Sequence, residues 1–342
     1  MADAVGLPVP RSLAPTGPVP SAAGRAPGSI RRTSTIDASW PGGIGADTVL
    51  EGRARDLVTT SGAEAEVLAE ASLAITVRTD RTIGSVASTP ARPELAGLVG
   101  APTGRGYRAR LAETAPAEVA ASSPLHLLLD DVPGAALVSG VAHRRWHDPD
   151  ELLVHGHLPG TRVVRGLCTG FQDGSSGLAP DGTSNPSYRT SRVQPVDALA
   201  DELAWHRLPA LPGMTMRRAR RLDVRVEGGS ILMDAFFQDS CMVPDGGRKA
   251  VHEYTLTAVA DLADGTLREL APVARVLPHH ECPLAIGHAE GVVGLPLAQL
   301  RPRVLKQLRS TAGCTHLNDL IRSLADVPTL VERLGGAKEV GR

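Results

Sequence analysis

The residues best suited to chemistry lie in the second half of the chain, where cysteine, histidine and acidic side chains recur. A His-Glu pair occupies 252–253, the run His-His-Glu-Cys occupies 279–282, and Cys314 is followed closely by His316. Thiolates and imidazoles are typical ligands of zinc. The cysteines of these segments are far apart and form no CxxC pair, so only the fold can bring them together.

Histidines elsewhere offer competing pairs. His143 and His147 have the i, i+4 spacing of ligands on a helix, and His155 and His157 would share one face of a strand. A glutamate that would complete the second pair is missing near His157. We therefore interpret these four histidines as exposed loop residues.

Composition excludes several functions. Thirty-six Lys and Arg residues against 37 Asp and Glu give a net charge of −1, which provides no general attraction to nucleic acid or to an anionic membrane. Aromatic residues make up 3%, too few for extended base-stacking surfaces. The expected partner is instead a small-molecule substrate, with a homodimer as a candidate assembly.

Cysteine usage and the absence of targeting patterns indicate a cytoplasmic protein. Four cysteines in 342 residues are too few for a disulfide scaffold. Cys168 and Cys241 have no ligand-type residues beside them and are interpreted as structural. No apolar run of membrane-spanning length and no signal-peptide pattern are evident, so no membrane span is expected.

The chain contains what reads as an internal repeat. Segment 73–86 and segment 254–276 each resemble two strands about a polar turn, and Asp264-Gly265 is a strong turn dipeptide. AGLVG at 96–100 matches EGVVG at 290–294, and SSPLHLLL matches AGCTHLND, which pairs His126 with His316. Because the matches occur in one order, a duplication is predicted.

These elements predict an α+β protein with two tandem copies of an antiparallel β-sheet, each with C-terminal helices packed on one face. The paired arginines of 217–221 are interpreted as the solvated end of a strand, with anion binding as the alternative. The expected organisation is a disordered lead at 1–28, a first copy without cysteine at 29–137, a linker or lid at 138–211, a second copy at 212–334 and a disordered tail at 335–342.

At GCTHLNDL (313–320) the chain resembles an uncharacterised bacterial domain family of unknown function. The His252-Glu253 pair, the Cys282-Pro283 step and the Val-Gly before the last helices contribute to this resemblance. The family implies no reaction.

The same layout looks like the U-type iron–sulfur scaffold proteins and their zinc-binding relatives. In those proteins a metal ligand opens a hairpin, a cysteine follows it at a helix start, and another cysteine precedes the last helix. The matching positions here are His252, Cys282 and Cys314. The scaffolds have cysteine followed by aspartate where this chain has His252 and Glu253, which puts cluster assembly in doubt.

The resemblance implies a Cys2His zinc site, which would leave one position for water or substrate. Glu253 or His316 could then transfer protons or orient a ligand, and His279 or His280 could replace His252. The leading hypothesis is a zinc-type lyase or hydrolase acting on a small organic molecule. The alternatives are a scaffold for iron, iron–sulfur clusters or sulfur, and a non-catalytic binding module with structural cysteines.

Overall fold

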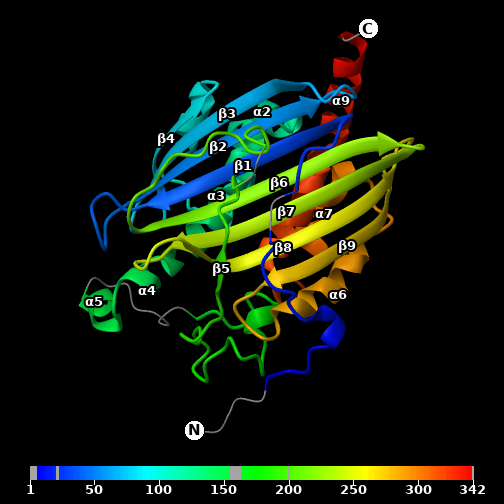
Figure 1. Cartoon of the computed structure of the whole chain (residues 1–342). Coiled ribbons are helices and arrows are strands. Elements are labelled where there is room, and N and C mark those ends of the chain that lie inside the picture. Colours follow the sequence, from blue (N-terminus) through cyan, green and yellow to red (C-terminus); the bar gives the residue numbers. More distant parts are fainter. Residues whose placement is uncertain (1–5, 21–22, 155–162, 199–200, 341–342) are drawn as a thin grey trace.

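The computed structural model describes residues 6–20, 23–154, 163–198 and 201–340, and within them nine strands form one antiparallel sheet. The antiparallel prediction is confirmed, but the strands form one continuous sheet rather than two, because β1 and β6 pair with each other at its centre (Figure 1). The order is β4-β3-β2-β1-β6-β7-β8, and both β9 and the short β5 pair with β8. The strands are β1 (Ser29–Ser39), β2 (Thr48–Thr59), β3 (Ala65–Val77), β4 (Ile83–Thr89), β5 (Ser191–Val193), β6 (Thr215–Glu227), β7 (Ser230–Met242), β8 (Arg248–Asp261) and β9 (Leu267–Val276).

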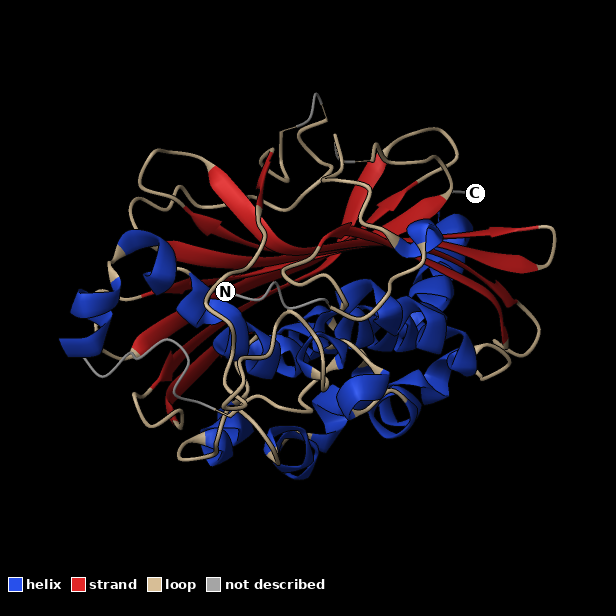
Figure 2. Ribbon diagram, turned by 90° about the horizontal axis from the view of Figure 1, so that it is seen from below, coloured by secondary structure: helices blue, strands red, loops and turns tan. Residues whose placement is uncertain are grey.

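The main helices cover one face of this sheet (Figure 2). They follow the two strand meanders, β1–β4 and β6–β9, in the chain. Each meander forms one half of the sheet and packs against the helices that come directly after it. The helices are α1 (Tyr107–Thr114), α2 (Pro116–Ala121), α3 (Pro124–Val138), α4 (His143–Trp146), α5 (Pro149–Val154), α6 (Ala285–Ala289), α7 (Leu300–Gln307), α8 (Thr315–Ser323) and α9 (Val327–Val340).

The two halves share details beyond the order of their elements. The backbone N–H of Gly100 donates to the carbonyl of Ile83 at the start of β4, and the N–H of Gly294 donates to the carbonyl of Leu267 at the start of β9. Both bonds are 2.8 Å long and both glycines have a positive φ. The last hairpin of each meander is therefore fastened to the following segment in the same way.

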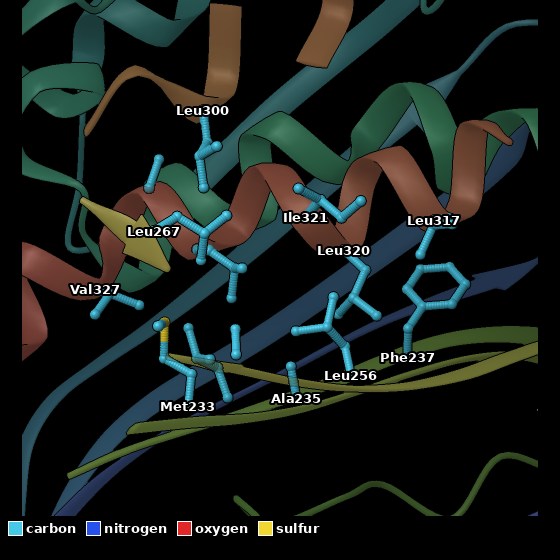
Figure 3. Packing of buried hydrophobic residues seen from close by; sticks show 14 of the residues in the cluster. Met233, Ala235, Phe237, Leu256, Leu267, Leu300, Leu317, Leu320, Ile321 and Val327 are labelled. Carbon is cyan, nitrogen blue, oxygen red and sulfur yellow. The ribbon is translucent and has the colours of Figure 1, made fainter. Parts of the chain in front are cut away.

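Apolar side chains fill the space between sheet and helices in two clusters, one under each half. Under the second half, Leu317 and Leu320 of α8 point toward Phe237 and Leu256 of the sheet (Figure 3), and Ile321 belongs to the same cluster. Burial of such side chains is the main favourable term in folding. It anchors α8, whose first turn contributes to the site described below.

The arginine-rich strand is buried, so its interpretation as a solvated strand end was wrong. Arg217, Arg218, Arg220 and Arg221 are all at most 8% exposed. They lie on the central strand β6 and alternate between the two faces, where carboxylates compensate them. Arg217 pairs with Asp37 on one face, and Arg218 and Arg220 pair with Asp239 and Asp131 on the helical face. A buried cation requires such partners.

Described residues near the two ends of the chain contact or continue the regular structure. The backbone N–H groups of Thr16 and Gly17 donate to Ala274 and Arg275 of β9, so the described part of the lead is fixed to the sheet. At the other end, α9 continues to Val340. The disordered lead and the disordered tail stay predictions.

The helical stretch Pro124–Trp146 is long and apolar enough to cross a membrane, with a mean hydropathy of 1.3, which the sequence analysis did not anticipate. The protein buries 78% of its most apolar window. Helix α3 within this stretch packs on β1, β2 and β3. Its apolar character is thus explained by its place in the core.

Candidate functional site

Two adjacent strands and one helix bring three potential ligands together. Asp239 on β7 and His252 on β8 are cross-strand partners in the sheet register, and α8 places His316 over them. His252 Nδ1 lies 3.7 Å and His316 Nε2 lies 3.4 Å from Asp239 Oδ2. One ligating atom from each of the three residues lies within 4.8 Å of the others.

The two imidazoles are stacked against each other. Their ring centroids are 3.4 Å apart and their planes differ by 17°. His252 Nδ1 and His316 Nε2 are buried without a hydrogen-bond partner among the described residues. Such unsatisfied nitrogens cost stability, and in functional sites they are satisfied by a ligand.

Burial determines the charges in this cluster. It lowers the pKa of His252 and of His316 well below the usual value, with neighbouring cations such as Arg218 adding to the effect, so both rings are neutral at pH 7. Burial raises the pKa of Asp239 to about 6, although Arg218 binds both carboxylate oxygens and opposes the rise. The neutral imidazoles are in the form that binds a metal.

One cavity, with a volume of about 350 Å³, is lined by three thiols and by both imidazoles. Cys314 is the residue before α8, and its Sγ is 3.7 Å from His316 Nδ1. Cys282 begins a short 3₁₀ helix after β9, and Cys168 comes from the segment between the two strand meanders. The backbone N–H and side chain of Thr169 both donate to the carbonyl of Gly313, which holds this segment beside Cys314.

The thiols are protonated when no metal is present. Burial, followed by the proximity of Cys314, raises the pKa of Cys168 to about 12. Burial likewise raises the pKa of Cys282 well above its usual value, with Cys168 and Cys314 adding to it. A metal would have to displace these protons to bind sulfur, as in other thiolate sites.

The structure gathers four of the five predicted site residues around the cavity: His252, Cys282, Cys314 and His316. The tight group, however, contains Asp239 and two histidines instead of the expected His252, Cys282 and Cys314. His279 also lines the cavity, whereas His280 is exposed. The ligand assignment itself remains a prediction.

Glu253 does not reach this cavity. Successive residues of a strand point to opposite faces, so His252 faces the helices and Glu253 faces the other side. There its carboxylate accepts from the N–H of Val19 and from the side chain of Gln238. A role beside the metal is therefore not supported by its position.

Asp239 and Cys168 were missed by the sequence analysis. An aspartate near the end of an apolar strand was visible in the sequence, but nothing marked it as a ligand. Cys168 was interpreted as structural because its partners are distant in the chain; in the structure it shares the cavity with Cys282 and Cys314. His143 lines the cavity too, whereas His155 and His157 lie outside the described residues.

The first half of the sheet has a related arrangement without the ligands. Asp56 is held by Arg32 as Asp239 is held by Arg218, and each aspartate precedes a shift in strand register. The cross-strand partner of Asp56 is Ala69, an alanine where the second half has His252.

The glycine before Cys314 is required by close packing. A Cβ atom at Gly313 would lie 2.2 Å from the backbone oxygen of Leu308. We expect Gly313→Ala to lower the free energy of unfolding by about 1–3 kcal/mol, because the backbone must move. Gly291→Ala, with nothing within 4 Å of its Cβ, is the control in urea unfolding. Equal stability of the two variants would contradict this account of Gly313.

Comparison with protein families gives one match. Residues 216–330 match a family described as "Protein of unknown function (DUF2889)", so a domain of this family is present in the second half of the chain. The domain includes Asp239, His252, Cys282, Cys314 and His316, while Cys168 precedes it. No curated protein and no solved structure matched the chain.

Proposed function

We propose that the domain at 216–330 is the active half of a metal-dependent lyase or hydrolase that acts on a small organic molecule. The observation that carries this proposal is the convergence of buried Asp239 with His252 and His316, two histidines on the wall of a cavity, each with a buried nitrogen that lacks a partner among the described residues. Two imidazoles and a carboxylate are a common ligand set for a catalytic divalent metal.

Zinc is the metal we favour, with iron as the alternative. A bound zinc ion would polarise a carbonyl group or lower the pKa of a water molecule. The spacing of the ligating atoms suits one ion, but nearly parallel rings 3.4 Å apart do not direct their lone pairs at a common point. Binding by both nitrogens therefore requires one ring to turn, and Cys314 next to His316 is positioned to serve as a further ligand.

Duplication with loss of the site from the first copy accounts for the rest of the chain. The matching bonds at Gly100 and Gly294 and the matching Arg–Asp pairs support a common origin of the two halves. Ala69 in place of His252 and a first half without cysteine support loss of the ligands. In this proposal the first copy has kept its structural role only.

A second candidate function is an iron–sulfur or sulfur-accepting scaffold. The observation that favours it is Cys168, which adds a third thiol to Cys282 and Cys314 in one cavity. This supplies the thiolate that the sequence comparison with such scaffolds lacked. Such clusters are commonly held by four cysteine thiolates, so an imidazole of His252 or His316 would have to supply the fourth ligand beside the three thiols.

Metal analysis of the purified full chain separates these functions. We expect about one zinc per chain, falling to less than about a tenth in His252→Ala and in His316→Ala, because each removes a ligand. His126→Ala, which removes the corresponding histidine of the first half, is the matched control and should retain the metal.

Iron with visible absorbance that is lost in Cys168→Ser would instead favour the scaffold. A chain that binds neither zinc nor iron, both as purified and after incubation with each metal, would overturn both functions. Circular dichroism of each variant shows whether metal is lost because a ligand was removed or because the variant is unfolded.

A further inference from the structure

The cavity is lined by chemically different groups. The imidazoles and thiols described above form part of its wall. Val138, Leu152 and Val251 give the wall an apolar surface, and Arg144 of α4 also lies on it with its side chain half-buried. Pockets that bind small molecules commonly combine an apolar surface with a few polar groups that set orientation.

Arg144 makes no ion pair or hydrogen bond with the residues that the structure describes. Its neighbour Arg145 is occupied, since it donates to Thr190 and lies 4.7 Å over the ring of Tyr188. Arg144 is therefore a cation on the cavity wall whose carboxylate partner is missing. This contrasts with the buried arginines of β6, which are compensated.

His279 adds no second positive charge beside Arg144 at pH 7. His279 shares the cavity wall, and burial lowers its pKa to about 4, with Arg144 and Arg189 adding to the effect and Glu281 opposing it. The Glu281 carboxylate already accepts from the hydroxyl of Ser176.

We propose that the ligand of this cavity is a small amphipathic organic acid, whose carboxylate pairs with Arg144 and whose apolar body lies along Val138, Leu152 and Val251. Arginine binds carboxylates through two parallel N–H bonds, which fixes orientation as well as adding affinity. His252, His316 and the thiols line the same cavity as Arg144. This names the substrate class of the proposed function and rests on that function only for the reaction.

Binding of octanoate and of its neutral analogue octanamide tests the proposal. Calorimetry is done on metal-free full-length protein, so that the carboxylate cannot be held by a metal. We expect octanoate to bind about tenfold more tightly than octanamide, and Arg144→Gln to remove this preference while octanamide binding stays unchanged. Arg189→Gln, which alters an exposed cation nearby, is the control and should keep the preference.

Equal binding of octanoate and octanamide by the unaltered protein, or an unchanged preference in Arg144→Gln, would overturn the proposal. If Arg144→Gln fails to fold, Arg144→Lys keeps the charge but not the paired N–H bonds and should show a reduced preference. Metal content is measured separately, so a chain that binds zinc without preferring octanoate refutes the substrate class alone. The reverse result refutes the metal function alone.

Discussion

Replacement of Arg218 by alanine is expected to lower the free energy of unfolding by about 3–5 kcal/mol, because it leaves buried carboxylates without their cation. Arg218 is 2% exposed on the central strand β6. Its guanidinium binds both oxygens of Asp239, at 3.0 and 3.1 Å, and one oxygen of Asp319, at 3.1 Å. Urea unfolding followed by circular dichroism measures the loss.

The control for this prediction is Arg225→Ala on the same strand. The side chain of Arg225 is 53% exposed and pairs only with exposed Glu227, so we expect a change within about 0.5 kcal/mol. If Arg218→Ala cannot be purified, Arg218→Met preserves the bulk of the side chain and should still destabilise strongly. A loss below about 1 kcal/mol in either variant would show that the ion pairs do not stabilise the sheet.

Stability is expected to fall with decreasing pH below about 6.5, partly through His206. Its ring lies between the hydroxyls of Thr33 and Thr35, each 2.9 Å from a ring nitrogen. Burial, followed by the cations of Arg55, Arg217 and Arg53, lowers its pKa to about 3. Between pH 6.5 and 3 the unfolded chain therefore binds a proton that the folded chain does not.

Because the unfolded chain binds the extra proton, the folded state loses stability as the pH falls. One such histidine costs about 1.4 kcal/mol of stability for each pH unit below 6.5, until the pH reaches its folded pKa. His206→Gln should make the decline between pH 6.5 and 4.5 shallower by up to this amount, whereas His288→Gln, which removes an exposed imidazole, should not. Urea unfolding at several pH values measures the slopes, and identical slopes in all three proteins would refute the buried neutral state of His206.

Local patterns in the sequence were sufficient to predict the hairpins. Asp264-Gly265 forms the turn between β8 and β9, where Gly265 has the positive φ that a turn dipeptide supplies. The pairing of β1 with β6 could not be predicted in the same way, since it joins segments nearly 190 residues apart and depends on which edges remain free. The burial of the β6 arginines depends on that pairing, so it could not be predicted either, and their interpretation as solvated was wrong.

The sequence predicted the part of the candidate site whose residues lie close together in the chain. His316 and Cys314 come from one turn, and their neighbourhood was visible in the sequence. The opposite orientation of Glu253 could have been deduced from strand alternation beside His252. The place of Cys168 could not be deduced, because Cys168 lies in a long irregular segment, and contacts such as that of Thr169 with Gly313, which hold it beside Cys314, join residues far apart in the sequence.

The central pairing of β1 with β6 also bears on solubility. Along eleven paired residues, Ser29 to Ser39, β1 occupies the backbone donors and acceptors of β6 that would otherwise face solvent. An open strand edge of that length is a template for association with other chains. The first half of the sheet thus covers a strand edge of the second half that would otherwise be open to pairing.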